Sequence, residues 1–197
     1  MSLIRNAAAL IRGNIICLAK KTVCSKTFNY NPKIRVFSKV LVSLRNKGRI
    51  TLNKNIKIDS GAFIASNGGN IILGENVGVG RNNVIVSQEK ISVGSGTILS
   101  PNVFIYDHDH DFDEKNGVKV NEYRKSAVTI GENCWIGANT VILRGTTVGN
   151  NCLVGAGCVL KGNYPDNSKI IQKRTTTIIG ENTYENGDSN RCQSVCL

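Results

Sequence analysis

The chain has 197 residues, a net charge of +11 and seven cysteines. This length fits one domain and leaves no room for a second catalytic domain. The cysteines form no CxxC pair and only two histidines are present, so no metal site is expected, and the unpaired thiols favour a reducing compartment such as the cytoplasm. No stretch approaches the length of a membrane span.

Residues 1–50 carry the excess positive charge. They contain eleven of the 25 Lys and Arg residues and none of the 14 acidic residues. Apolar residues recur there at helical spacing, which predicts a basic amphipathic helix; they are Leu3, Ile4, Ala7, Ala8, Ile11, Ile15 and Leu18. No recognition motif accompanies the charge, so nucleic-acid binding is not predicted.

Two interpretations of this helix stay open. It contacts an anionic membrane surface through residues 1–26, or it packs on the rest of the fold with a solvated charged face. Arg12 interrupts the apolar stretch and argues against a secretory signal, whereas an organelle transit peptide stays open. Alternating apolar residues from Lys33 to Arg45 then predict one or two strands that cap the following fold. Residues 1–50 are therefore expected to form a helix and strand extension.

From residue 52 an aliphatic residue returns at every sixth position, in groups of three separated by short insertions. Strands alternate at two and helices turn at 3.6, so three short strands per triangular coil explain this period best. The pattern predicts an all-β solenoid of about five parallel coils over residues 51–174, with Gly, Asn and Asp at the corners. The phased residues are Leu52, Ile58, Ile64, Leu73, Val79, Ile85, Val93, Leu99, Ile105, Ile130, Ile136, Ile142, Val148, Val154 and Leu160.

The register is interrupted at length once, by a loop at 106–129. The loop begins Tyr-Asp-His-Asp-His-Asp and holds both histidines, His108 and His110. A long loop on a rigid scaffold is a usual place for function. Imidazole titrates near neutral pH, so either histidine suits a general base.

These features resemble the hexapeptide-repeat acyltransferases, and most closely the capsule and lipopolysaccharide sugar O-acetyltransferases and the galactoside and maltose acetyltransferases. The resemblance covers roughly Leu52 to Arg174. It implies a left-handed β-helix, a homotrimer with active sites between subunits, and acetyl-CoA as co-substrate without a metal. Pro101-Asn102-Val103 leads into Ile105, and the resemblance makes His110, five positions further on, the catalytic base, with His108 as the alternative.

The resemblance also implies supporting residues. Asn82 and Asn83 fall near an asparagine that positions the acceptor, although asparagine is also the usual corner residue. Trp135 falls beside the pantetheine arm, although an outward Trp also suits subunit packing. Cofactor-binding positions carried over from the family, together with cations suited to the CoA phosphates, are Ala138, Ala156, Lys161, Lys173 and Arg174.

The expected function is acetyl-CoA-dependent O-acetylation of a sugar hydroxyl on a surface polysaccharide or its precursor, by direct transfer with a histidine base. Two alternatives stay open: N-acetylation of a nucleotide-linked amino sugar, and a non-catalytic β-helix scaffold. The expected location is the cytoplasm, with attachment to the inner face of the membrane left open. Residues 175–197 are polar and are expected to form a mobile tail.

Overall fold

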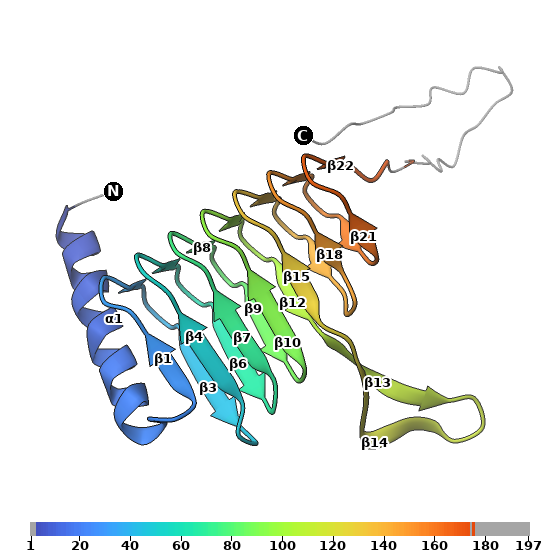
Figure 1. Ribbon diagram of the computed structural model, residues 1–197, viewed down its shortest axis with the longest axis horizontal. Helices are drawn as coiled ribbons and strands as arrows, with labels where there is room; N and C mark the ends of the chain where they lie inside the picture. The colour runs from blue at the N-terminus through green and yellow to red at the C-terminus, as the bar shows by residue number, and fades with distance from the viewer. Residues whose placement is uncertain (1–2, 174, 176–197) are drawn as a thin grey trace, which may run out of the picture.

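The computed structural model describes residues 3–173 and 175, and it shows a triangular prism of stacked turns with a helix at one end (Figure 1). The helix is α1 (Leu3–Val23). Parallel strands form the three walls of the prism, and the predicted β solenoid is confirmed. The expected tail at 175–197 lies, except for residue 175, outside the described residues.

Three sheets form the walls. The first sheet contains β1 (Phe28–Tyr30), β4 (Arg49–Leu52), β7 (Asn70–Leu73), β10 (Lys90–Val93), β15 (Val128–Ile130), β18 (Thr147–Val148) and β21 (Asn163–Tyr164). The second contains β2 (Arg35–Val36), β5 (Lys57–Ile58), β8 (Gly78–Val79), β11 (Ile98–Leu99), β16 (Trp135–Ile136), β19 (Leu153–Val154) and β22 (Lys169–Ile170). The third contains β3 (Leu41–Arg45), β6 (Phe63–Asn67), β9 (Val84–Ser87), β12 (Phe104–Tyr106), β17 (Val141–Ile142) and β20 (Val159–Leu160).

The expected count of five coils is too low. The prism has six complete turns and a seventh that contributes only β21 and β22. The first turn is built by β1, β2 and β3, which pair in parallel with the next turn, so Tyr30 lies beside Leu52. Tyr30 and Tyr164 occupy the first inward position of the two end turns. Because each of these turns has a tyrosine where the pattern requires an aliphatic residue, the period of six did not reveal them.

The core is a continuous column of aliphatic side chains along the prism axis. Each hexad residue meets its counterpart one turn away, as Ile64 meets Ile85 and Ile85 meets Ile105, and these three side chains are fully buried. Asparagines with positive φ take many of the corners, for example Asn82 at 54° and Asn139 at 58°. A corner asparagine tolerates this left-handed conformation better than a β-branched residue.

Helix α1 packs across the N-terminal end of the prism (Figure 1). Its buried residues are small: Ala9, Gly13 and Cys17. A Cβ added at Gly13 would lie 2.0 Å from the carbonyl oxygen of Ile34, so glycine lets the helix backbone touch the first turn directly. Burial raises the pKa of the Cys17 thiol to about 11, which keeps it protonated. The helix therefore covers the end for which the sequence predicted strands.

The loop at 106–129 forms an antiparallel hairpin of β13 (His108–Asp113) and β14 (Gly117–Lys125). It leaves the prism after β12, in the fourth turn, and the chain returns at β15. The hairpin projects away from the walls of the prism (Figure 1). Its residues are therefore free to reach another molecule while its base stays fixed to the stack.

Candidate active site

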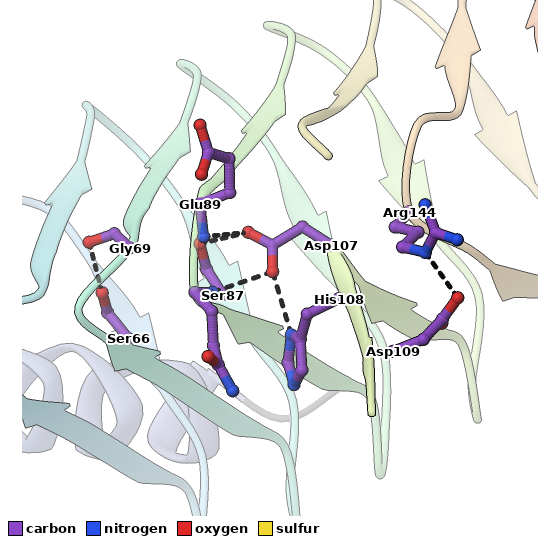
Figure 2. A network of polar contacts seen from close by, with 9 residues as sticks. Ser66, Gly69, Ser87, Glu89, Asp107, His108, Asp109 and Arg144 are labelled. Carbon is purple, nitrogen blue, oxygen red and sulfur yellow. Dashed lines mark hydrogen bonds and ion pairs between the residues drawn. The ribbon is translucent and has the colours of Figure 1, made fainter. Parts of the chain in front are cut away.

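Asp107 anchors the base of the hairpin. Its side chain is fully buried, and its carboxylate accepts hydrogen bonds from the Ser87 hydroxyl at 2.6 Å, the Gln88 backbone N–H at 2.8 Å and the Glu89 backbone N–H at 2.9 Å (Figure 2). Burial alone would raise the pKa of Asp107, but the hydrogen bonds from His108, Ser87 and the two amides outweigh it and lower the pKa. Asp107 is thus an ionised acceptor that ties the hairpin to the turn below.

His108 is the fourth partner of this carboxylate. Its Nδ1 lies 3.0 Å from Oδ1 of Asp107, and 12% of its side chain is exposed. The ring packs edge-on against Tyr106 and Tyr123, with centroids 6.2 and 5.5 Å apart. His108 is therefore fixed in position by the two tyrosine rings and by its hydrogen bond with Asp107.

His110 lies two residues further along β13 and is exposed. Its ring lies 4.7 Å from the Tyr123 ring, centroid to centroid, on the opposite strand. Among the described residues, its imidazole has no hydrogen-bond or ion-pair partner. The two histidines therefore differ: one is bound to an acid at the hairpin base, and the other is presented to solvent.

Two further acids of the hairpin form ion pairs that hold its strands in place. Asp109 pairs with Arg144, which follows β17 in the next turn, and Asp111 pairs with Arg124 and Lys119 on the opposite strand (Figure 2 shows the first pair). The pKa of Asp111 is lowered by its hydrogen bonds with Lys119 and Arg124. Asp107, Asp109 and Asp111 are thus all engaged, and of these three Asp107 is the one that contacts a histidine.

Asn82 and Asn83 both support the prism itself. Asn82 belongs to a ladder of corner side chains that continues through Asn102 to Asn139. Asn83 is fully buried, and its side chain accepts from the Val103 N–H at 2.8 Å and donates to the Leu99 carbonyl at 3.5 Å. These contacts account for both residues without a substrate.

Trp135 points outward from the second sheet, and 54% of its surface is exposed. Its indole N–H donates to Ser100 Oγ at 2.9 Å. Ser100 lines an open groove of about 420 Å³ along the same sheet, together with polar residues from the lower turns that include Arg35, Lys57 and Asp59. The groove lies on the second sheet, whereas the hairpin follows β12 of the third sheet, so the two are on different faces of the chain.

The predicted cofactor positions gather toward the C-terminal half of the prism. Ala138 and Ala156 occupy the same corner in successive turns, where Gly157 N–H donates to the Ala138 carbonyl at 2.7 Å. Lys161 and Lys173 are exposed; Lys173 follows Gln172, whose amide bonds the backbone of Val159. Arg174 lies outside the described residues.

No contact in a single chain joins His110 to Trp135 or to the two lysines within the described residues. The sequence did not single out Arg144 or the Asp107 anchor. The available signal for Asp107 was an acid two residues after the inward Ile105, at the point where the register breaks. Within residues 3–173 and 175, no group of three or more His, Cys, Asp or Glu side chains is placed to hold a metal ion.

Comparison with known proteins places this geometry in a family. Residues 127–162 match the model described as bacterial transferase hexapeptide (six repeats). Over 164 residues the chain is 31% identical to WbbJ of Escherichia coli, provisionally named a lipopolysaccharide biosynthesis O-acetyl transferase, covering 79% of this chain and 82% of WbbJ. Nodulation protein L of Rhizobium meliloti is 37% identical over 112 residues, covering 55% of this chain and 59% of that protein.

Solved structures share the fold. AntD, an N-acyltransferase from Bacillus cereus solved with dTDP and 3-hydroxybutyryl-CoA, superposes with a TM-score of 0.63 at 18% identity, covering 75% of this chain and 80% of AntD. The polySia-specific acetyltransferase NeuO superposes with a TM-score of 0.53 at 18% identity, covering 71% of this chain and 64% of NeuO. Hexapeptide repeats indicate a left-handed β-helix, as the resemblance implied. The chain therefore belongs to the hexapeptide-repeat transferase family and is an acyltransferase.

Proposed function

We propose that this protein transfers an acetyl group from acetyl-CoA to a sugar hydroxyl of a surface polysaccharide or its precursor in the cytoplasm, with His110 as general base. The observation that carries the proposal is an exposed histidine on a hairpin whose base is fixed by a buried carboxylate. The names of WbbJ and NeuO, which refer to lipopolysaccharide biosynthesis and polysialic acid, support the acceptor class.

The reaction needs one base and a way to stabilise an oxyanion. An imidazole nitrogen of His110 takes the hydroxyl proton as the sugar oxygen bonds to the thioester carbonyl carbon. Backbone N–H groups at the glycine-bearing corners are suited to stabilise the tetrahedral oxyanion. The C–S bond then breaks, and the imidazolium returns the proton to the CoA sulfur.

His108 has a different role in this proposal. Its Nδ1 is engaged by Asp107, and its ring is wedged against two tyrosines, so little of it is open to a substrate. It positions the start of β13, from which His110 projects two residues later. A base must reach the proton it removes, and exposure therefore favours His110.

The acetyl-CoA arm fits the corner formed by Ala138 and Ala156, because small side chains let an extended chain lie close to the backbone. Lys161 and Lys173 are exposed cations suited to the CoA phosphates. Trp135 lies on the same sheet as the groove and bonds to Ser100 in its lining, so an acceptor sugar in the groove would stack on the indole. The contacts of Asn82 and Asn83 give them a supporting role in the prism.

A homotrimer would bring these parts together. The outward face of the third sheet is an unbroken apolar row from the first turn to the sixth: Leu41, Phe63, Val84, Phe104, Val141 and Val159. Such a row favours burial against another copy. Because the groove and the hairpin lie on different faces of one chain, a neighbour's hairpin would supply His110 to the groove side of the next subunit.

The test follows release of free CoA and acetylated product with acetyl-CoA and a panel of sugars, amino-sugar nucleotides and capsule oligosaccharides. His110→Ala should lower kcat/KM by about 10²-fold or more, as expected for the loss of a general base. Phe112→Ala, an exposed neighbour on the same strand, is the matched control and should stay near wild type. His108→Ala should retain measurable turnover.

Other outcomes would replace the proposal. Full activity in His110→Ala with loss in His108→Ala would make His108 the base. Product found only on an amine would favour N-acetylation. The absence of both acetyl-CoA binding and transfer would favour a scaffold.

A further inference from the structure

The solvent side of α1 is apolar. Ile4, Ile11, Ile15 and Leu18 are large hydrophobic residues with exposed fractions of 81%, 62%, 63% and 58%. None of them packs on the prism, because Ala9, Gly13 and Cys17 occupy the contact. The helix therefore has one small-residue face toward the fold and one large apolar face toward solvent.

Helix geometry shows how sharply the two faces are separated. At 3.6 residues per turn, the four exposed residues fall within a stripe of about 60°. This stripe lies directly opposite Gly13, whose Cα meets the first turn. An apolar stripe this far from the core has no partner within the described part of the chain.

Cations border the stripe. Arg5 and Arg12 lie on one side of it, and Arg5 also stacks over the Phe37 ring at 5.4 Å. Lys21 lies on the other side, where its Nζ donates to the Ser25 carbonyl and to Asn29 Oδ1. No acidic residue occurs among residues 1–50, so nothing in this segment offsets the charge.

The stripe and its flanking cations indicate which partner covers the exposed face of α1. A second copy would bring the same excess of positive charge against itself, which opposes association. An anionic bilayer satisfies both parts at once, because the apolar stripe enters the acyl boundary while Arg and Lys meet the headgroups. The described helix is not long and apolar enough to cross a membrane, so the contact would be along the surface.

We infer that α1 docks this protein on an anionic membrane surface, with Ile4, Ile11, Ile15 and Leu18 inserted and the flanking cations at the headgroups. The inference is independent of the acyl acceptor, since it rests only on the exposed face and its charge. It resolves the two sequence-based interpretations by giving each face of the helix its own partner.

The test is flotation of the full chain with vesicles of phosphatidylcholine alone or mixed with phosphatidylglycerol. Wild type should float mainly with the mixed vesicles. Ile15→Gln should weaken this binding about tenfold, as expected for one large apolar side chain withdrawn from the acyl region. Asn14→Gln introduces the same residue at the adjacent exposed position outside the stripe and should bind like wild type.

Charge is tested separately by Arg12→Gln, which should weaken binding to mixed vesicles about fivefold. All three substitutions are at exposed positions, so unfolding curves should superpose and show that the fold is intact. Equal flotation of Ile15→Gln and wild type, or no flotation of wild type, would overturn the inference. Concentration-dependent assembly that Ile15→Gln abolishes would instead assign the face to a second copy.

Discussion

Replacing Asp107 with asparagine tests whether this carboxylate anchors the hairpin. One carboxylate oxygen accepts from Gln88 N–H and His108, and the other from Ser87 and Glu89 N–H. An amide can place its oxygen on only one of these pairs, and its NH₂ group must face the other. His108 and Ser87 can switch to accepting, but a backbone N–H cannot, so one amide of the 88–89 turn loses its acceptor in either orientation.

The cost follows from that lost acceptor. A buried N–H without a partner costs about 1–3 kcal/mol, and hydrogen bonds to a charged acceptor contribute about 1.5–3 kcal/mol each. We therefore expect Asp107→Asn to lower the free energy of unfolding by about 2–4 kcal/mol at pH 7, measured by guanidinium denaturation. Asp113→Asn is the control, because this half-buried acid accepts in a local turn that asparagine can also make.

The effect should depend on pH in one direction. The folded pKa of Asp107 is lowered, so its contribution is fully present above the unfolded pKa of about 4 and is lost as the pH falls through the folded pKa. The difference between wild type and Asp107→Asn should therefore shrink below about pH 4. Equal stability of the two proteins at pH 7, or a difference that grows on acidification, would refute the anchor.

Two other perturbations probe the ends and walls of the prism. Gly13→Leu should detach or tilt α1, because even a Cβ at this position would lie 2.0 Å from the Ile34 carbonyl oxygen. The rate of amide hydrogen exchange should therefore rise across α1. Unchanged protection would show that the contact between the helix and the first turn is not tight. Phe104→Asp places a charge in the middle of the apolar row of the third sheet. If the proposed trimer packs through this row, the variant should sediment as a monomer, whereas a variant that sediments like wild type would locate the interface elsewhere.

The sequence predicted those parts of the fold in which each turn places an inward aliphatic residue at every sixth position. The strict period of six identified the central turns and the point where the hairpin leaves, because every inward position there is aliphatic. The end turns escaped notice because Tyr30 and Tyr164 each have only one neighbouring turn to pack against, so the demand for an aliphatic side chain is weaker there. A turn count drawn from periodicity alone therefore falls short at both ends.

The site was harder to predict for a different reason. Periodicity locates the loop and both histidines, but it does not say which of three nearby acids turns inward. Asp107 does so because it directly follows the last strand of its turn, where the chain still lies against the wall. In α1, likewise, the apolar spacing predicted a helix, yet packing used the small residues Ala9, Gly13 and Cys17, which permit the closer approach.

The number of turns below the hairpin acts as a molecular ruler. The hairpin leaves after β12, three strand spacings above β3 in the first turn. With strands about 4.8 Å apart and a helix about 10 Å across, the root of the hairpin stands roughly 25 Å above the outer surface of α1. This height can change only in steps of one whole turn. If α1 lies on a surface that also holds the acceptor, the number of turns sets the distance between that surface and the root of the hairpin.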